Sequence, residues 1–296
     1  MKNKKIISVL IFIIAALAVF ATVMGIFSGD GPGEYDYTSI RGKEILIYGE
    51  GIYKDMSAEL AVQGIAQDVV TLVFGVPALL ISFFYFRRNS FRAKILLTGV
   101  LGYFLVTYLF YLTMAMYNNL FLVYIVLLAC SFFAFLVLAL SYKMDEMKSV
   151  FNEKFPRKSL GWFLIISSIL TATLWFGVVV PPLMQNVYPP QVEHYTTLIV
   201  QGLDLSILLP AAFISGLLLL KQNRFGYLLA PIYSVFLSFL MTALSAKIIA
   251  MGFQGVNVIP VVFIIPAINL TAVFLMVITM KSLKWKNLPN HEIEKL

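Results

Sequence analysis

Long apolar runs separated by short polar segments dominate this chain. A helix rises about 1.5 Å per residue and needs roughly 20 apolar residues to cross a hydrocarbon core about 30 Å thick. Runs of about this length cover Ile6–Phe27, Val69–Phe86, Ile95–Met116, Leu120–Tyr142, Leu160–Val180, Leu198–Leu220, Tyr227–Ala250 and Val256–Met280. The pattern therefore predicts an all-α fold, a polytopic membrane bundle of about eight transmembrane helices. Interior prolines are expected to kink some of these helices, namely Pro77, Pro210, Pro260 and Pro266.

Two polar segments on the same side of the predicted bundle have structure of their own. Within residues 28–68, the stretch YTSIRGKEILIYGEGIY alternates polar and apolar residues around Arg41 and Gly42, which is typical of a β-hairpin. The stretch PPLMQNVYPPQVEHY favours a stiff, extended strap because of its prolines, Pro181, Pro182, Pro189 and Pro190.

Composition agrees with a membrane protein. The chain is 60% hydrophobic and only 12% charged, well below the quarter of charged residues typical of soluble domains. The single cysteine, Cys130, excludes an intramolecular disulfide and a thiolate metal cluster. The net charge of +7 comes from short clusters beside apolar runs, so it indicates topology and gives no support for nucleic-acid binding.

The positions of Lys and Arg orient the chain, because cytoplasmic loops retain them. With the amino terminus inside, 18 of the 22 basic residues fall in inner segments, whereas 10 of the 15 acidic residues lie toward the outer side. We therefore expect a plasma-membrane protein with both termini cytoplasmic and residues 28–68 extracellular. The first run resembles a signal peptide, but its length favours an uncleaved anchor, and cleavage would leave seven spans.

Short sequence matches suggest an internal duplication. VQGIAQD at residues 62–68 resembles VQGLD at residues 200–204, and the basic turn RRNSF at 87–91 resembles KQNRF at 221–225. The matches predict two parallel four-helix halves, residues 1–145 and 146–296, the second ending in a short cytoplasmic tail. Once the basic turns are aligned, the aspartates of the two halves are two positions out of register.

Three charged residues fall inside or at the edge of the predicted helices, where each costs about 2.5–3.5 kcal/mol on insertion scales. Helical rise places Asp68, Asp204 and Lys247 at a similar depth near the outer face. They are therefore candidates for binding a substrate, cation or proton, or for an internal ion pair that a substrate displaces. The alternative is an ordinary interfacial ion pair, or side chains that reach out to water.

Four uncharged polar residues complete the candidate set: Gln63, Gln201, Tyr111 and Asn269. Tyr111 shares a helical face with Tyr103 and Thr107, a stripe that would suit a cavity or a cation-binding aromatic wall. Asn269 lies nearest the bilayer midplane, where a hydrogen bond between helices is favoured over substrate contact.

No hydrolase, metalloprotease, thiol-redox or phosphate-binding motif occurs, so no catalytic residue, metal site or cofactor is expected. The pattern resembles that of many bacterial multi-pass membrane proteins, and this resemblance implies no catalytic residues. The favoured hypothesis is a small permease with a small-molecule or ion substrate, embedded in the lipid bilayer. The alternatives are a sensor or accessory subunit that contacts a protein partner through residues 28–68, and, less favoured, a lipid-modifying enzyme.

Overall fold

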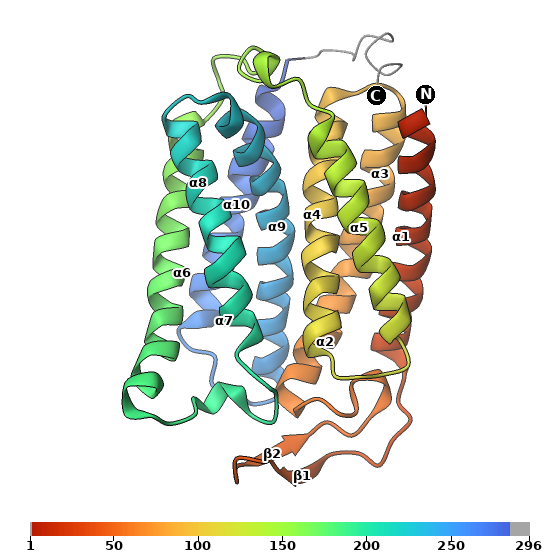
Figure 1. The fold of residues 1–296 in the computed structure, drawn as a ribbon, viewed down its shortest axis with the longest axis vertical. Helices are drawn as coiled ribbons and strands as arrows, with labels where there is room; N and C mark the ends of the chain where they lie inside the picture. Colours follow the sequence, from red (N-terminus) through yellow and green to blue (C-terminus); the bar gives the residue numbers. More distant parts are fainter. Residues whose placement is uncertain (1, 285–296) are drawn as a thin grey trace.

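The computed structural model describes residues 2–284 as an elongated helical bundle (Figure 1). Eight helical segments in this part of the chain are long and apolar enough to cross a membrane, which confirms the predicted mostly helical architecture and its number of spans. The predicted carboxyl-terminal tail lies outside the described residues from 285 onward. The elements are α1 (Lys2–Phe27), β1 (Tyr35–Thr38), β2 (Glu44–Ile47), α2 (Ala58–Val70), α3 (Val76–Arg87), α4 (Phe91–Met114), α5 (Phe121–Leu140), α6 (Arg157–Gln185), α7 (Ile199–Leu203), α8 (Leu209–Leu220), α9 (Arg224–Phe253) and α10 (Val261–Ser282).

The second span begins well before the residue expected from the sequence. It runs continuously from Ala58 to Arg87, so Asp68 lies within a helix and not at the start of one. Ten residues of helix precede Asp68, which corresponds to about 15 Å. Polar residues interrupt the apolar run here, but side chains of other helices satisfy several of them, and the segment between the first two spans therefore ends at Ser57.

Two of the spans each contain a π-helical segment. Thr71–Gly75 joins α2 to α3, and Asp204–Leu208 joins α7 to α8. The prolines Pro77 and Pro210 follow directly, each at the second position of the next α-helix. A proline ring clashes with the carbonyl four residues earlier, and the wider π turn gives that carbonyl room. The two spans therefore stay continuous across their prolines.

Two predictions about prolines were wrong. Pro181 and Pro182 lie inside α6, which continues to Gln185, so only the shorter segment after it forms the strap. Pro260 precedes α10 and does not kink its interior. An isolated segment rich in proline favours extended structure, but neighbouring helices in a bundle can satisfy the carbonyls that a proline frees.

The predicted β-hairpin is confirmed. Strands β1 and β2 pair antiparallel, with Tyr35 opposite Ile47 and Thr38 opposite Glu44. Gly42 has a φ of +73° in the connecting turn, a conformation that glycine adopts without steric cost. The hairpin lies at one end of the bundle, and the start of α1 and the end of α10 lie at the other (Figure 1). These ends are called the hairpin end and the terminal end below.

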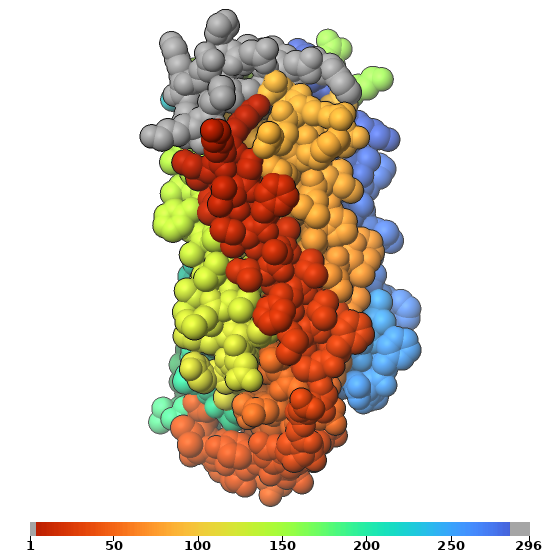
Figure 2. Space-filling view, turned by 90° about the vertical axis from the view of Figure 1, so that its right-hand side faces the viewer, coloured from red at the N-terminus to blue at the C-terminus, as the bar shows by residue number. Residues whose placement is uncertain are grey.

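Helices α1–α5 and α6–α10 form two groups that lie side by side (Figure 1). In the first group, α1 lies between α3 and α5 (Figure 2). The groups meet where α4 packs on α9, and at two further contacts, α2 with α9 and α7 with α4. Gly99 brings α4 close to α9, because a Cβ there would lie 2.4 Å from Val235 Cβ and 2.8 Å from the Ile232 carbonyl oxygen.

Basic side chains hold helix ends together at the terminal end. Arg157 donates to the carbonyl of Leu220 at 2.8 Å, which is the last residue of α8. Lys94 donates to the carbonyl of Ser141 at 2.8 Å, just after α5. The last carbonyls of a helix lack partners within that helix, so these cations satisfy exposed acceptors and complement the helix dipole.

Candidate functional site

Asp68 is the most deeply buried carboxylate of the site, with none of its side chain exposed. The hydroxyl of Tyr53 donates to its Oδ2 at 2.6 Å, and the hydroxyl of Tyr111 donates to its Oδ1 at 2.8 Å. Tyr53 belongs to the loop after the hairpin, and Tyr111 belongs to α4. Burial raises the pKa of Tyr53 well above 10, so its phenol keeps its proton and remains a donor.

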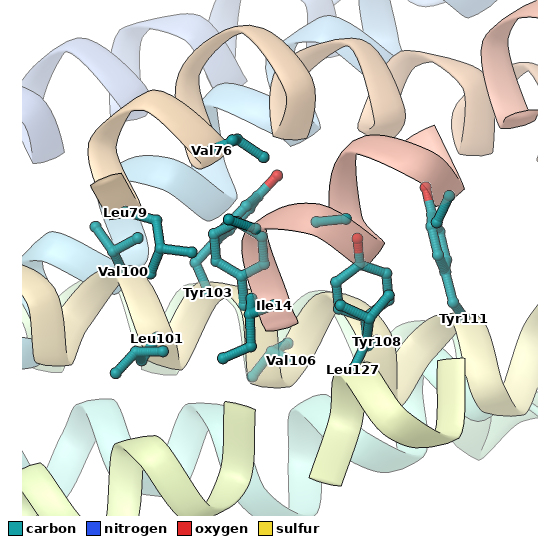
Figure 3. Close-up of a cluster of buried hydrophobic side chains, with 14 of the residues drawn as sticks. Ile14, Val76, Leu79, Val100, Leu101, Tyr103, Val106, Tyr108, Tyr111 and Leu127 are labelled. Atoms are coloured by element: carbon teal, nitrogen blue, oxygen red, sulfur yellow. The ribbon is translucent and has the colours of Figure 1, made fainter. Parts of the chain in front are cut away.

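Two further tyrosines pack around this pair. Tyr108 and Tyr111 extend from the same side of α4 (Figure 3), with ring centroids 5.8 Å apart, and Tyr124 of α5 lies 5.4 Å from Tyr111. Tyr108 is fully buried and Tyr124 is 1% exposed, yet neither hydroxyl has a hydrogen-bond partner within residues 2–284. Buried polar groups without partners are uncommon and occur at sites that strain or function requires.

A second polar network continues from Asp68 toward the π segment. Gln67 donates through Nε2 to the hydroxyl of Tyr103 at 2.8 Å and to Oγ1 of Thr107 at 3.2 Å. Thr71, the first residue of the π segment, shares a hydrogen bond of 2.7 Å with Tyr103. The predicted stripe of Tyr103, Thr107 and Tyr111 therefore faces α2 and binds its polar side chains.

Lys247 of α9 lies within electrostatic reach of both Asp68 and Asp204. Its side chain is only partly exposed, and in the described part of the chain it forms no hydrogen bond or ion pair. Asp204 instead accepts a hydrogen bond of 2.8 Å from the indole of Trp175 on α6. The structure thus brings together one carboxylate from each group of helices and one lysine between them.

The two groups repeat the same local geometry at positions 133 residues apart. The matched features are the start of the π segment, the proline after it, a left-handed residue in the basic turn and the capping residue of the next helix, at Thr71/Asp204, Pro77/Pro210, Asn89/Gln222 and Ser90/Asn223. In this register Asp68 matches Gln201, and Asp204 lies three positions later. Alignment of the basic turns by sequence predicted that the two aspartates are offset by two positions, whereas the structural register makes the offset three.

The remaining candidates contribute to contacts between helices. Gln63 donates to the sulfur of Met251 at 3.1 Å, which joins α2 to α9. Gln201 is buried on α7, which packs on α4. Asn269 accepts a hydrogen bond of 3.3 Å from Thr242, which joins α10 to α9. Asn269 thus takes part in an interhelical hydrogen bond, the role that the sequence favoured.

The hairpin and the strap cover the hairpin end together. Arg41 donates to the carbonyls of Tyr195 at 2.9 Å and Glu193 at 3.3 Å, and the backbone N–H of Ser57 donates to the hydroxyl of Tyr195 at 3.3 Å. His194 is hydrogen-bonded to the carbonyl of Asp55 at 3.0 Å. Burial raises the pKa of the Glu193 carboxyl above 4.5, and it raises the pKa of Tyr195 to about 12. These contacts, called the latch below, join the segment after α1 to the segment after α6.

Sequence reasoning missed Tyr53, Tyr108, Tyr124, Trp175 and Gly25. Four are aromatic residues in a chain with 15% aromatics, so their type alone carries no signal. Gly25 is essential to the geometry, because a Cβ there would lie 1.8 Å from Oδ2 of Asp68. A glycine near the end of an apolar run is an ordinary feature, and only the packing of α1 against α2 gives it meaning.

No group of three or more His, Cys, Asp or Glu side chains within residues 2–284 is arranged to hold a metal ion. A comparison of the chain with protein-family models, curated proteins and solved structures gave no match. The fold and composition define the class as a multi-pass integral membrane protein. Its candidate site is a set of buried charges between two groups of helices.

Proposed function

We propose that this protein is a small permease that carries a polar solute between its two groups of helices. The carrying observation is that Lys247 lies within electrostatic reach of both Asp68 and Asp204, which come from different groups of helices. Charges inside a membrane are costly, and where they occur they commonly mark substrate or ion pathways. A lysine without a hydrogen-bonded partner can move from one carboxylate to the other when the two groups of helices move or when a solute enters.

The contacts between the groups support a rocking motion. At the α4–α9 contact the backbones approach closely through Gly99, which suits a pivot. The charges lie away from this pivot, toward the hairpin end, where α2 packs on α9 and α7 packs on α4. Movement of one group against the other about such a contact is the usual basis of alternating access. The π segments next to both aspartates supply deformable turns.

The proposal includes the orientation and the repeat. Both termini would be cytoplasmic and the hairpin extracellular, because the basic residues concentrate at the terminal end. The halves would be residues 1–145 and 146–296, and the local geometry that recurs 133 residues apart supports their common origin. The latch would then be an outer cover over the solute path.

The single cysteine makes a test possible without knowledge of the solute. In a Cys130→Ala background, Ser245→Cys places a thiol at a buried position of α9, away from the Gly99 contact and only two residues, about 3 Å along the helix, from Lys247. A membrane-impermeant maleimide is applied to right-side-out and to inside-out vesicles. If the protein is a permease, the thiol becomes accessible to the reagent from at least one face of the membrane. The double variant Asp68→Asn with Asp204→Asn then changes the rate of labelling severalfold.

The control for this test is Ile40→Cys, since Ile40 is 90% exposed in the hairpin turn. It reports which face the reagent reaches and should react fully from one side. If Ser245→Cys stays unlabelled from both faces while Ile40→Cys reacts, the bundle is a static scaffold and the permease proposal fails.

The exposed outer strand favours a second candidate, an accessory subunit that binds a protein partner. All four residues of β1 are exposed, and Ile40 follows on the same surface. Tyr35→Ser with Ile40→Ser removes apolar area there without touching Arg41 or Tyr53. A partner role predicts loss of the complex from crosslinked native membranes with unchanged labelling of Ser245→Cys, whereas an unchanged complex argues against it.

A further inference from the structure

We infer that Asp68 is a proton-binding site whose hydrogen bonds fit both protonation states of its carboxyl group. The inference rests on the proposed function, because it names the ion that would drive the solute. It starts from Tyr111, whose hydroxyl faces two acceptors at once: Oδ1 of Asp68 at 2.8 Å and the carbonyl oxygen of Gly64 at 3.0 Å. A phenol has one hydrogen, so it donates to one of them at a time.

In the charged state, Tyr111 donates to Oδ1 and Tyr53 donates to Oδ2 at 2.6 Å. Each carboxylate oxygen then has a phenolic donor, and hydrogen bonds to an ionised acceptor are the stronger kind. Lys247 adds electrostatic stabilisation from α9. This arrangement accounts for a carboxylate that is fully buried in the bundle.

In the neutral state, a proton from water bonds to Oδ1 of Asp68, and the site's net charge rises by one. The new O–H donates to the hydroxyl oxygen of Tyr111, and Tyr111 turns its own hydrogen to the Gly64 carbonyl. Tyr53 continues to donate to Oδ2. No proton leaves a tyrosine and no heavy atom has to move, so every hydrogen bond of the charged state has a counterpart.

The packing favours a proton over a larger cation. The centroids of Tyr53, Tyr108 and Tyr124 lie 5.4–6.3 Å from their nearest partners in the cluster, distances of rings in direct contact. An ammonium ion held between aromatic faces needs its own width between them. On the α1 side, Gly25 lies so close that even a methyl group would overlap Oδ2.

The titratable groups that face Asp68 are few. From α4 they are Tyr103, Tyr108 and Tyr111, and the other packed elements contribute Tyr53, Tyr124 and Lys247. The phenols stay neutral near pH 7, so Lys247 is the charged group whose interactions change when Asp68 binds a proton. When Asp68 is protonated, Asp204 is the carboxylate that still attracts Lys247. The electrostatic attraction of Lys247 therefore shifts from the first group of helices to the second.

Infrared difference spectroscopy of the purified protein in lipid nanodiscs tests the inference without any solute. Every carboxyl group that takes up a proton on acidification contributes a carbonyl-stretch band, so the band of Asp68 is the component that Asp68→Asn removes and that Asp204→Asn and Glu193→Gln leave. Tyr111→Phe should shift the band in frequency, because the carboxyl group loses its acceptor. Tyr108→Phe is the matched control, since it removes a neighbouring hydroxyl that has no partner.

If Asp68→Asn removes no component of the carbonyl-stretch bands seen in the parent, the inference is overturned. It is also overturned if Tyr111→Phe and Tyr108→Phe change the Asp68 band equally. Either result leaves the labelling of Ser245→Cys unaffected, so the permease proposal can survive it. Conversely, a static bundle can still bind a proton at Asp68. The two failures are therefore distinguishable.

Discussion

Gly25 of α1 and Asp68 of α2 are in direct contact, and the contact leaves no room for a side chain on the glycine. A Cβ at position 25 would lie 1.8 Å from Oδ2 of Asp68 and 3.0 Å from the hydroxyl of Tyr53. Helix α1 thus closes the carboxylate against the two tyrosines that hold it. This contact explains how a charge inside the bundle is shielded from lipid on its α1 side.

Gly25→Ala should lower the free energy of unfolding by about 1–3 kcal/mol, the usual cost of forcing a methyl group into a packed site. Thermal unfolding in detergent measures the loss. In an Asp68→Ala background the same substitution should cost little, because the clashing oxygen is gone and the two changes are coupled.

Gly177→Ala in α6 is the control, since nothing lies within 4 Å of its added methyl group. Alanine has the higher helix propensity, so this variant should be neutral or gain up to about 1 kcal/mol. An equal loss in Gly25→Ala and Gly177→Ala would contradict the assigned contact.

Gly99→Ala should separate the two groups of helices at the α4–α9 contact. The added methyl group would meet the backbone of Ile232 at 2.8 Å, and a backbone atom cannot rotate away. Gly102→Ala meets its neighbours at ordinary distances of 3.7 Å or more. Thermal unfolding should therefore show a loss of about 1–3 kcal/mol for the first and a much smaller change for the second; similar melting temperatures would argue against the close approach.

Arg41→Lys should weaken the latch nearly as much as Arg41→Ala. The guanidinium reaches several strap carbonyls at once through two nitrogens, and an ammonium group cannot copy this fork. The expected loss is about 1–2 kcal/mol in thermal unfolding, with faster proteolysis of residues 186–198. Lys43→Gln, which removes one exposed contact to Pro190, should have a small effect. Full stability in Arg41→Lys would contradict the role assigned to the two guanidinium nitrogens.

The latch should be more stable in acid than at neutral pH because of Glu193. Burial raises the pKa of this carboxyl in the folded protein above its usual 4.5. The stability that its neutral form contributes is therefore fully present below pH 4.5 and is lost as the pH rises through the raised value. Melting curves should show Glu193→Gln more stable than the parent at about pH 8 and equal to it at about pH 4. A constant difference between the two proteins would show that the carboxyl does not titrate.

The number of spans was predictable because membrane crossing depends on a local sum over about 20 residues. The hairpin was predictable for a similar reason, since alternation around Gly42 is a property of adjacent residues. The start of the second span was not, because Gln63 and Gln67 look unfavourable in isolation. Their partners, Met251 and Tyr103, lie on helices that are far from them in the sequence.

The sequence by itself determined that this chain crosses a membrane and that Asp68, Asp204 and Lys247 are its costly charges, since both follow from composition along short windows. Tertiary structure alone decided what surrounds those charges. Tyr53 reaches Asp68 from the loop after the hairpin, and Gly25 packs against Asp68 from α1. Hydrogen bonds and close contacts of this kind join residues far apart in the chain, so no local pattern encodes them.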